Sequence, residues 1–353
     1  MSYFNEYTIS VSDATFNRIC EDYDIVRAYD DDQYYEADAL VYCSDIEDYV
    51  REHYYTCEDC GEYFYYSDSV HYIEYDGYYC DHCMEQMRGP IEDYHSNKGN
   101  YIFYGDGNKY IGYELEVDGG FDRANCAYDI QRILHDRVFF EEDGSLSDGG
   151  FEIISNPHTL EVFDELKIEE VMKICKNYGF TSHDSGNCGL HLHFSKAWFG
   201  DTCAEQSENI ALVTKFYHHN FEIMKKLSRR DGTRYCEDEN YDFANKSLDK
   251  VINDKKNSSR YSAVNLQPLD AHGTVEFRLG RGTLVYNTFM AWLDIHCAIA
   301  NASKTAKNYD FLEWINPGTV KPETWEYIEK KLGLPLQKDG LKSFAIIDNG
   351  EVA

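Results

Sequence analysis

Four segments of the chain alternate apolar and charged side chains with a period of two, the pattern of a β-strand with one buried face. They are KYIGYELEVDGG (109–120), GGFEIISNPH (149–158), NCGLHLHFS (187–195) and GTVEFRLGRGT (273–283). In these segments apolar side chains occupy one face, and acidic, histidine or arginine side chains occupy the other. We predict that the apolar faces cover a core and that the charged faces line either water or a shared cleft.

Other segments repeat apolar residues at the period of an α-helix. The predicted helices cover residues 124–137, 159–179, 205–228 and 287–306. Nearer the start of the sequence, DALVYCS (38–44) indicates a short strand. The next segment, SDIEDYVREHY (44–54), predicts a helix in which Ser44 and Glu47 form a capping box. Strands and helices together favour the α+β class.

Residues 54–83 contain two Cys-x2-Cys pairs, Cys57 with Cys60 and Cys80 with Cys83, separated by 19 residues. Each pair can offer two thiolates to one tetrahedral ion, and the segment between the pairs is expected to form a hairpin. A segment this short and polar has no core without a metal. We therefore predict a zinc-ribbon module in which the four cysteines bind a structural Zn²⁺, with no open position for catalysis.

The chain is strongly acidic, with a net charge of −31 over 353 residues, and residues 1–100 hold 24 Asp/Glu against 5 Lys/Arg. Such a field repels nucleic acid, so we expect no nucleic-acid partner. It mainly keeps the surface solvated, although a basic protein or a polyamine could dock on it. We expect no membrane association and a cytoplasmic location. No stretch approaches the ~20 apolar residues of a membrane span, and MSYFNEYTIS does not resemble a secretory signal.

The charged faces of the predicted strands carry a recurrent set of residue types. The residues come in twos along the sequence: Glu114 and Glu116, Asp143 and Glu152, His191 and His193, and Glu276 and Arg278. The segment SSRYSAVNLQP adds Arg260 and Asn265. Carboxylates are hard oxygen ligands for Mg²⁺, and arginine forks bind phosphate oxygens. The chain has no Gly-rich phosphate loop of the G-x-x-x-x-G-K-[ST] kind. Converging in one cleft, these side chains would suit divalent cations and a polyphosphate.

The motifs GYELEV, EDGSL, FEIIS, CGLHLHF, RYSAVNLQ and GTVEFRLGRGT, in this order, resemble the amidoligase family of carboxylate–amine ligases. This family is related to glutamine synthetase and glutamate–cysteine ligase, and members of this branch often come from phages. The resemblance covers roughly residues 108–305. It implies a glutamine-synthetase-like fold, in which a curved antiparallel sheet carries flanking helices. It also implies ATP and Mg²⁺ or Mn²⁺ as cofactors, and an amide bond formed through an acyl phosphate.

The resemblance also implies roles for individual residues. The implied Mg²⁺ ligands are Glu114, Glu116, Asp143, Glu152, His193 and Glu276, and the implied ATP or phosphate contacts are Arg260, Asn265, Arg278 and Arg281. The implied catalytic set is Glu114, Glu116, His191, His193, Glu276 and Arg278. Two alternatives stay open: either histidine of the pair could approach the metal or phosphate, and Glu141 or Glu142 could replace Asp143.

We divide the chain into four expected parts: an acidic Tyr-rich region (1–52), the zinc-ribbon-like module (53–95), the ligase domain (96–305) and a helical C-terminal extension (306–353). The expected substrates are a small-molecule or peptide carboxylate and an amine, in the host cytoplasm if the chain is phage-encoded. Two other functions compete with the ligase. One is a metal-dependent hydrolase, because His-x-His with carboxylates also describes hydrolytic sites. The other is a non-catalytic, acidic, zinc-binding interaction protein.

Overall fold

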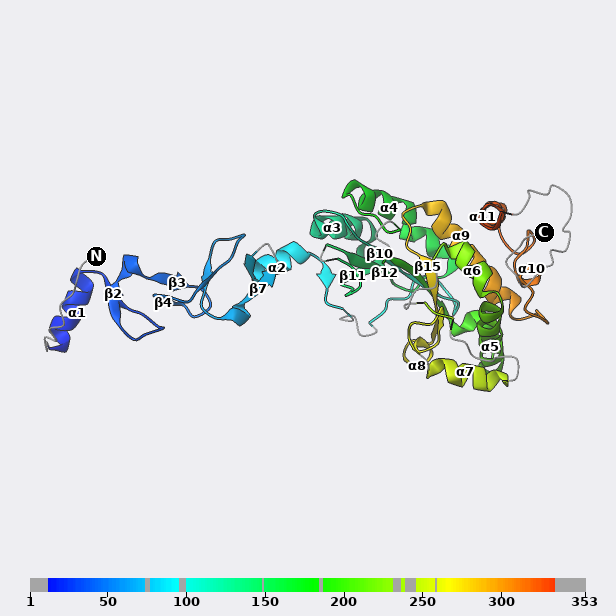
Figure 1. The fold of residues 1–353 in the computed structure, drawn as a ribbon, viewed down its shortest axis with the longest axis horizontal. Helices are drawn as coiled ribbons and strands as arrows, with labels where there is room; N and C mark the ends of the chain where they lie inside the picture. Colours follow the sequence, from blue (N-terminus) through cyan, green and yellow to red (C-terminus); the bar gives the residue numbers. More distant parts are fainter. Residues whose placement is uncertain are drawn as a thin grey trace. The chain divides into compact units, whose positions relative to one another are not determined.

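The computed structural model describes residues 12–73, 77–94, 100–147, 149–183, 187–230, 236–238, 246–257 and 259–333 (Figure 1). The chain forms two compact units, residues 1–89 and residues 90–353. The expected division into four parts stays a prediction, and residues 334–353 of the expected extension lie outside the described residues. None of the described helices is long and apolar enough to span a membrane.

The first unit is built from short elements. Its helices are α1 (Asp13–Asp22) and α2 (Asp81–Arg88). Its strands are β1 (Ile25–Arg27), β2 (Tyr34–Glu36), β3 (Val41–Cys43), β4 (Asp48–Val50), β5 (Tyr55–Thr56), β6 (Tyr63–Phe64), β7 (Val70–Ile73) and β8 (Gly77–Cys80). Strands β3 to β6 make one small sheet, and β7 pairs antiparallel with β8. The pairing of β7 with β8 is the hairpin expected between the two cysteine pairs.

The predicted helix over residues 44–54 is wrong. Residues 44–47 form a turn that joins β3 to β4, and Glu47 has a left-handed φ of 52°, which no helix interior contains. The Ser44 hydroxyl donates to Glu62 instead of capping a helix. Val41 pairs with Val50 across the turn. The strand pairing on both sides of residues 44–47 thus decides the structure here, and not the capping pattern of Ser44 and Glu47.

The second unit contains a seven-stranded sheet in the order β14-β15-β13-β10-β12-β11-β9. Its strands are β9 (Ile91–Glu92), β10 (Ile111–Val117), β11 (Val138–Glu141), β12 (Phe151–Ser155), β13 (Gly189–Ser195), β14 (Val264–Asn265) and β15 (Thr274–Arg281). Neighbouring strands are antiparallel except for β9 and β11, which are parallel. The four segments that alternate in the sequence are thus β10, β12, β13 and β15, side by side in one sheet.

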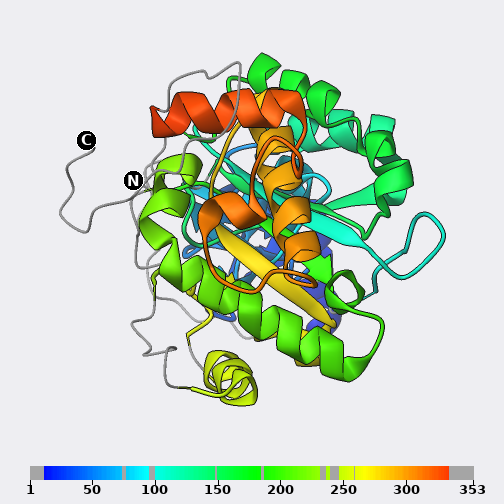
Figure 2. The same ribbon diagram turned by 90° about the vertical axis from the view of Figure 1, so that its right-hand side faces the viewer.

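The helices described in the second unit are α3 (Arg123–Leu134), α4 (Ile168–Asn177), α5 (Cys203–His219), α6 (Phe221–Ser228), α7 (Leu248–Lys256), α8 (Pro268–Ala271), α9 (Tyr286–Ala302), α10 (Phe311–Trp314) and α11 (Pro322–Leu332). Buried side chains of α3, α4, α5, α6 and α9 join the core on the apolar face of the sheet, whereas Pro268 and Ala271 of α8 line a cavity on the opposite face. Figure 2 shows α9 and α11 packed against each other. The prediction of a mixed chain of sheets and helices is confirmed.

Two of the predicted helices are interrupted. The segment predicted over residues 159–179 forms a 3₁₀ helix (Leu160–Leu166) and then α4, because Lys167 adopts a left-handed φ of 43° between them. The segment predicted over residues 205–228 divides at Asn220 into α5 and α6. The Asn220 side-chain amide donates to the carbonyl groups of Phe216 and Tyr309, and it thereby fixes the break.

The alternation in the sequence becomes two chemically distinct faces of the sheet. Tyr113 of β10 packs edge-on against Phe289 of α9, with ring centroids 5.3 Å apart. Phe277 of β15 lies 4.5 Å from the ring of His296, also on α9. The alternate positions of the same strands carry charged side chains that line a cavity. The core therefore fixes the strands whose opposite face forms the candidate site.

Candidate active site

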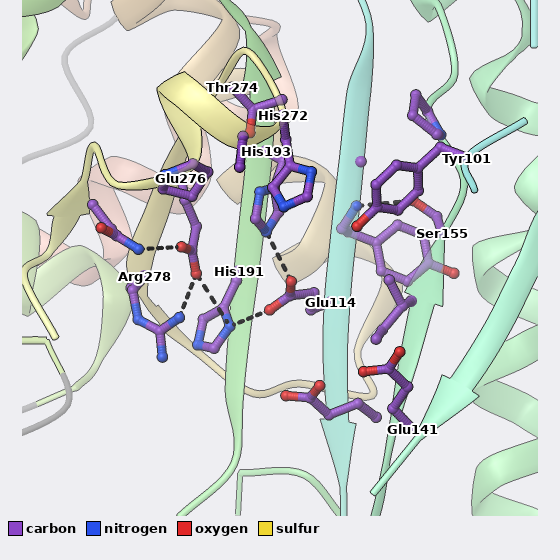
Figure 3. A pocket seen from close by; sticks show the side chains of 18 of the residues that line it. Tyr101, Glu114, Glu141, Ser155, His191, His193, His272, Thr274, Glu276 and Arg278 are labelled. Carbon is purple, nitrogen blue, oxygen red and sulfur yellow. Dashed lines mark hydrogen bonds and ion pairs between the residues drawn. The ribbon is translucent and has the colours of Figure 1, made fainter. Parts of the chain in front are cut away.

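The centre of the site is a carboxylate held between two imidazoles. Glu114 of β10 pairs in register with His191 of β13. One oxygen of Glu114, Oε2, lies 2.8 Å from His191 Nδ1, and the other, Oε1, lies 3.0 Å from His193 Nε2 (Figure 3). Burial raises the pKa of Glu114, but the positive charge of His193 and the hydrogen bonds to both histidines outweigh it, so the pKa lies well below its usual range.

Two overlapping groups of ligand atoms surround Glu114. The first is Glu114, His193 and Glu276, and the second is Glu114, Glu152 and His191. Within each group the ligand atoms lie within 4.8 Å of one another, close enough to bind one metal ion. Each group offers two carboxylate oxygens and one imidazole nitrogen, a donor set that can hold a divalent cation. Both histidines thus belong to a potential metal group, whereas the sequence left open which of them approaches a metal.

The next strand outward, β15, places an ion pair at the edge of this cluster. Glu276 lies opposite His193 in the register, and its Oε1 accepts a hydrogen bond from Arg278 Nη1. Glu276 Oε2 accepts from the side-chain amide of Asn265, at 2.7 Å. Burial raises the pKa of Glu276, but the charges of Arg278 and His193 lower it by more than burial raises it. The pKa of Glu276 therefore lies below its ordinary value. Arg278 Nε is buried and has no hydrogen-bond partner among the described residues.

Two more carboxylates, Glu116 and Glu141, lie around Glu152 and extend the cluster toward β12 and β11. Glu116 of β10 accepts a hydrogen bond from the Gly189 N–H, and its Oε1 lies 3.6 Å from His191 Nε2. Glu152 lies opposite both Glu116 and Glu141 in the register. Burial, followed by the charges of Glu114, Glu116 and Asp143, raises the pKa of Glu152 well above its usual range. A divalent cation here would relieve the repulsion that this crowding creates.

The adjacent acids Glu142 and Asp143 have different positions. Asp143 lines the cavity, and its Oδ1 accepts from the Ser145 N–H at 2.7 Å. Glu142 forms an ion pair with Arg123 of α3 at 3.0 Å. The described residues that line the cavity include Asp143 but not Glu142. This placement favours Asp143 over Glu142 as the member of the site.

The loop that carries Asp143 is also anchored on its other side. Asp118, one residue beyond β10, accepts hydrogen bonds from the Ser147 hydroxyl and from the Ser147 N–H, the latter at 3.3 Å. The Asp118 side chain is buried. Asp118 therefore continues the alternation of Glu114 and Glu116 in the sequence, but it contacts the loop instead of the cavity.

The remaining predicted arginines divide between two environments. Arg260 lines the cavity and donates to the hydroxyl of Tyr94. Arg281 ends β15, and its guanidinium donates to the backbone carbonyl of His183. Arg281 is not among the described residues that line the cavity. The roles predicted for these arginines as phosphate contacts stay predictions.

The cavity itself measures about 600 Å³ and has an aromatic as well as a charged lining. Tyr101, His272 and Thr274 lie at one end of it, and Arg278 and Glu141 lie at the other (Figure 3). Burial, then the charges of Glu114 and Glu141, raises the pKa of Tyr101. Sequence reasoning did not identify Tyr101 or His272, because both come from irregular segments without a periodic pattern.

Two buried residues near the site were also missed. Glu141, considered only as a substitute for Asp143, lines the cavity beside Phe139 on β11. Recognition of VFFE as a strand would have placed Glu141 on the charged face by alternation. Arg230 donates to the carbonyl groups of Arg278 and Gly280, at 3.1 and 3.2 Å. These carbonyls flank a register shift between β13 and β15, so Arg230 stabilises the backbone that presents Arg278.

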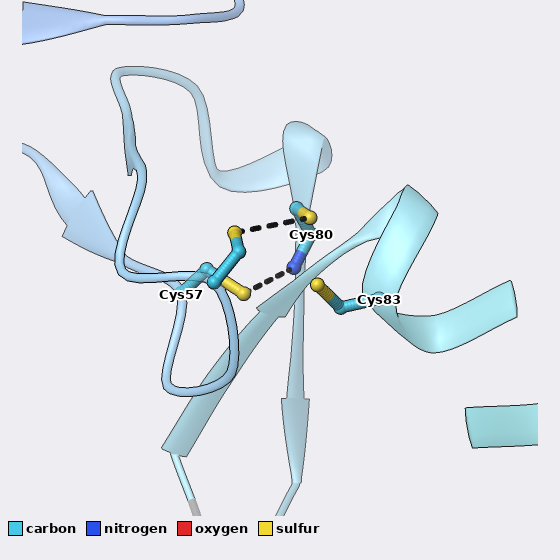
Figure 4. Close-up of side chains that lie close together, drawn as sticks. Cys57, Cys80 and Cys83 are labelled. Carbon is cyan, nitrogen blue, oxygen red and sulfur yellow. Dashed lines mark hydrogen bonds between the residues drawn. The ribbon is translucent and has the colours of Figure 1, made fainter. Parts of the chain in front are cut away.

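In the first unit, the four predicted cysteines form a separate cluster. The sulfur atoms of Cys57, Cys60, Cys80 and Cys83 lie within 4.8 Å of one another. Cys60 and Cys80 are 3.9 Å apart, and the Cys80 N–H donates to the sulfur of Cys57 (Figure 4). Burial raises the pKa of Cys57, but backbone N–H groups outweigh it and lower the pKa to about 6. The cluster is compatible with zinc.

Comparison with known proteins identifies the family. The chain matches the family described as "Putative amidoligase enzyme" over residues 55–300. This match covers more than half of the chain, and the protein therefore belongs to the amidoligase family. Membership supports a carboxylate–amine ligase in general. The resemblance read from the ordered motifs is thus confirmed. No curated protein matches the chain.

Two solved structures are similar at a distance. A bifunctional glutathione synthetase from Pasteurella multocida is 12% identical with a TM-score of 0.34, and the match covers 64% of this chain and 47% of that one. A novel glutamine synthase homolog is also 12% identical with a TM-score of 0.34, over 64% of this chain and 62% of that one. The chain thus spans less than two thirds of the length of either structure.

Proposed function

We propose that the protein is an ATP-dependent carboxylate–amine ligase that forms an amide bond through an acyl phosphate. The observation that carries this proposal is the pair of metal-binding groups that share Glu114, with Arg278 beside them. The geometry fits a reaction in which negative charge accumulates on a transferred phosphoryl group. Family membership supports the same class of reaction.

The reaction balances without an oxidant or a reductant. A carboxylate oxygen of the acid forms a bond to the γ-phosphorus of ATP, and ADP leaves with the electron pair of the broken P–O bond. The amine nitrogen then forms a bond to the acyl carbon, and inorganic phosphate leaves. The amine loses a proton to a base, and in this proposal a carboxylate that lines the cavity, such as Glu141, accepts it.

The donor set fits Mg²⁺ or Mn²⁺. Glu114, Glu276 and His193 would hold one cation, and Glu114, Glu152 and His191 a second. When bound, such cations neutralise phosphate oxygens and orient them for transfer. Glu116 and Asp143 lie next to these groups, and their charges raise the pKa of Glu152, so they add to the field that attracts cations.

The basic side chains have complementary tasks. Asn265 donates to Glu276, which in turn accepts a hydrogen bond from Arg278, and the guanidinium of Arg278 lines the cavity as a phosphate contact in this proposal. Arg260 is a second phosphate contact in this proposal, since it lines the same cavity. A curved antiparallel sheet of the glutamine-synthetase type would present these groups without a Gly-rich phosphate loop.

Three expectations outside the active site also stand as proposals. The four-cysteine cluster holds a structural Zn²⁺ in a zinc-ribbon-like module, because it offers four thiols at one point. The acidic first hundred residues offer a docking surface for a basic protein. The protein works in the cytoplasm, where ATP and reduced thiols are available.

The test is ATP turnover by two charge-removing variants. Glu114→Gln and Glu276→Gln should lower Mg²⁺-dependent release of phosphate at least about a hundredfold, the scale of removing one group that stabilises transition-state charge. Glu326→Gln, at an exposed position on α11, is the matched control and should keep wild-type turnover. Circular dichroism checks that all three variants fold.

The same assay separates the competing functions. Turnover that requires ATP, a divalent cation and an amine supports the ligase. Cleavage of amides without ATP would support a metal-dependent hydrolase, and the absence of both activities would support a non-catalytic interaction protein. Wild-type rates in Glu114→Gln and Glu276→Gln would refute the assignment of the site.

A further inference from the structure

The cavity of the second unit has two chemically different ends. The charged end contains Glu141, Asp143, Glu152, Arg260 and Arg278. The aromatic end is lined by Tyr101, Phe103, Tyr110, Phe139 and His272. Gly112 marks the aromatic side along β10 and Glu116 the charged side, and the four residue steps from one to the other span about 13 Å. Glu114 lies midway, so both ends are within reach of the metal-binding groups.

The aromatic end is assembled from residues that pack on one another. The ring of Tyr101 lies edge-on to His272, with centroids 5.7 Å apart, and 6.1 Å from the ring of Phe139. Phe103 and Tyr110 form a second edge-on pair at 4.9 Å. The ring of Tyr101 thus lies between His272, just before β15, and Phe139 of β11. Figure 3 shows Tyr101 and His272 in the upper part of the cavity. Its ring presents a wall to any ligand at this end.

The charges of the cavity are distributed unevenly. Among the described residues that line it, Arg260 and Arg278 are the only lysine or arginine side chains. Both lie away from the aromatic end: Figure 3 shows Arg278 at the same end as Glu141, and Arg260 donates to the hydroxyl of Tyr94. Among the described residues, the aromatic end has no lysine or arginine to bind a second carboxylate, and His193, which lies opposite Gly112, already pairs with Glu114. It has one buried hydroxyl oxygen, Thr274 Oγ1, without a partner among the described residues.

The geometry of phosphoryl transfer relates these ends to the substrates. The attacking and leaving oxygens lie on opposite sides of the transferred phosphorus. The arginines of the charged end indicate the side of the nucleotide phosphates, because phosphate oxygens bind arginine forks. The attacking acid must then approach from the opposite side, which is the aromatic end.

We propose that the aromatic end binds the carboxylic-acid substrate, and that this acid carries an apolar or aromatic group next to its reacting carboxylate. The proposal rests on the proposed ligase function. Tyr101 is then the specificity-determining residue, since its ring packs against that group. An acid with a second charged carboxylate, such as glutamate, would leave that charge unpaired among aromatic rings.

Isothermal titration calorimetry can test this with phenylacetate, acetate and glutamate as probes. Each is titrated into the full chain with Mg²⁺ and a non-hydrolysable ATP analogue. Phenylacetate should bind about tenfold or more tightly than acetate and than glutamate, on the scale of burying one aromatic ring. Tyr101→Ala should lose most of this preference, and Tyr101→Phe should keep it because the ring remains. Tyr128→Ala, exposed on α3, is the matched control and should bind all probes as the wild type does.

Three results would overturn the proposal. Glutamate could bind more tightly than phenylacetate, or Tyr101→Ala could keep the wild-type preference. The third comes from titrating Mg·ADP and Mg·diphosphate: a loss of affinity in Tyr101→Ala for ADP alone would place the nucleobase at the aromatic end. The same titrations separate failure of this proposal from failure of the ligase function. A wild-type chain that binds neither Mg·ADP nor Mg·diphosphate would refute the nucleotide site, whichever acid the chain binds.

Discussion

His296 in the middle of α9 gives a pH dependence that the structure predicts quantitatively. Its side chain is fully buried, its Nδ1–H donates to the carbonyl of Trp292 at 2.7 Å, and its Nε2 accepts from the hydroxyl of Tyr217. The bond that Nε2 accepts from Tyr217 requires the neutral imidazole, because both ring nitrogens of a protonated histidine are donors. Burial lowers the pKa of His296 from 6.5 to about 4, only partly opposed by the hydrogen bond to Trp292.

This pKa difference has a definite sign. Between about pH 6.5 and pH 4 the unfolded chain binds a proton at His296 and the folded chain does not, so acid favours unfolding. The free energy of unfolding should fall by ~1.4 kcal/mol between about pH 7.5 and pH 5.5 from this residue alone. At pH 5.5 the chain stays above its sequence pI of about 4.6, which helps solubility.

The assay is urea unfolding followed by tryptophan fluorescence. All four tryptophans, Trp198, Trp292, Trp314 and Trp325, lie in the second unit, so the signal does not report on the first. His296→Gln keeps a side chain that can donate and accept hydrogen bonds but removes the titration. The free energy of unfolding of the wild type minus that of the variant should be ~1.4 kcal/mol smaller at pH 5.5 than at pH 7.5. The contributions of other titrating groups are the same in both proteins and cancel in this difference. An equal difference at both pH values would refute the reasoning.

Three further predictions follow from other parts of the molecule. On the proposal that the four cysteines hold zinc, Cys57→Ser should release zinc and unfold the first unit while tryptophan fluorescence is unchanged, as measured by zinc release and circular dichroism. Ser147→Ala should weaken Mn²⁺ binding several-fold in a calorimetric titration, because the hydrogen bond to Asp118 anchors the loop of the site, and Ser147→Thr should restore it. Gly280→Ala should lower the free energy of unfolding, measured in urea, by about 1–3 kcal/mol, because the new Cβ would lie 2.6 Å from the indole nitrogen of Trp292. Gly144→Ala is the control: its Cβ meets no atom within 4 Å, so the free energy of unfolding should fall by less.

The main sheet was predictable because its strands have a strict alternation. Glu114, His191 and Glu276 could be placed on one face from the period of two, and the structure brings all three into the two groups that could hold a metal ion. The order of the strands was not available from this pattern. Strand β10 lies between β12 and β13, an arrangement set by packing between distant segments.

The failures have local physical causes. Ser44 and Glu47 satisfied a capping pattern, yet Val41 and Val50 pair across the turn, and Val50 is fully buried. Asp118 shares the spacing of the site carboxylates but lies just beyond the strand end, where it accepts hydrogen bonds from the loop. Tyr101 belongs to an irregular segment, so only the folded chain reveals its position over the cavity.

The division of Glu114 between two groups has a consequence for how the site fills. Its Oε2 lies with His191 and its Oε1 with His193, so one side-chain rotation sets the geometry of both groups. Occupancy of either group by a cation would change the affinity of the other, and by thermodynamic reciprocity the two changes are equal. A stepwise metal titration would therefore measure a coupling free energy between the groups, with Glu114 as the physical link.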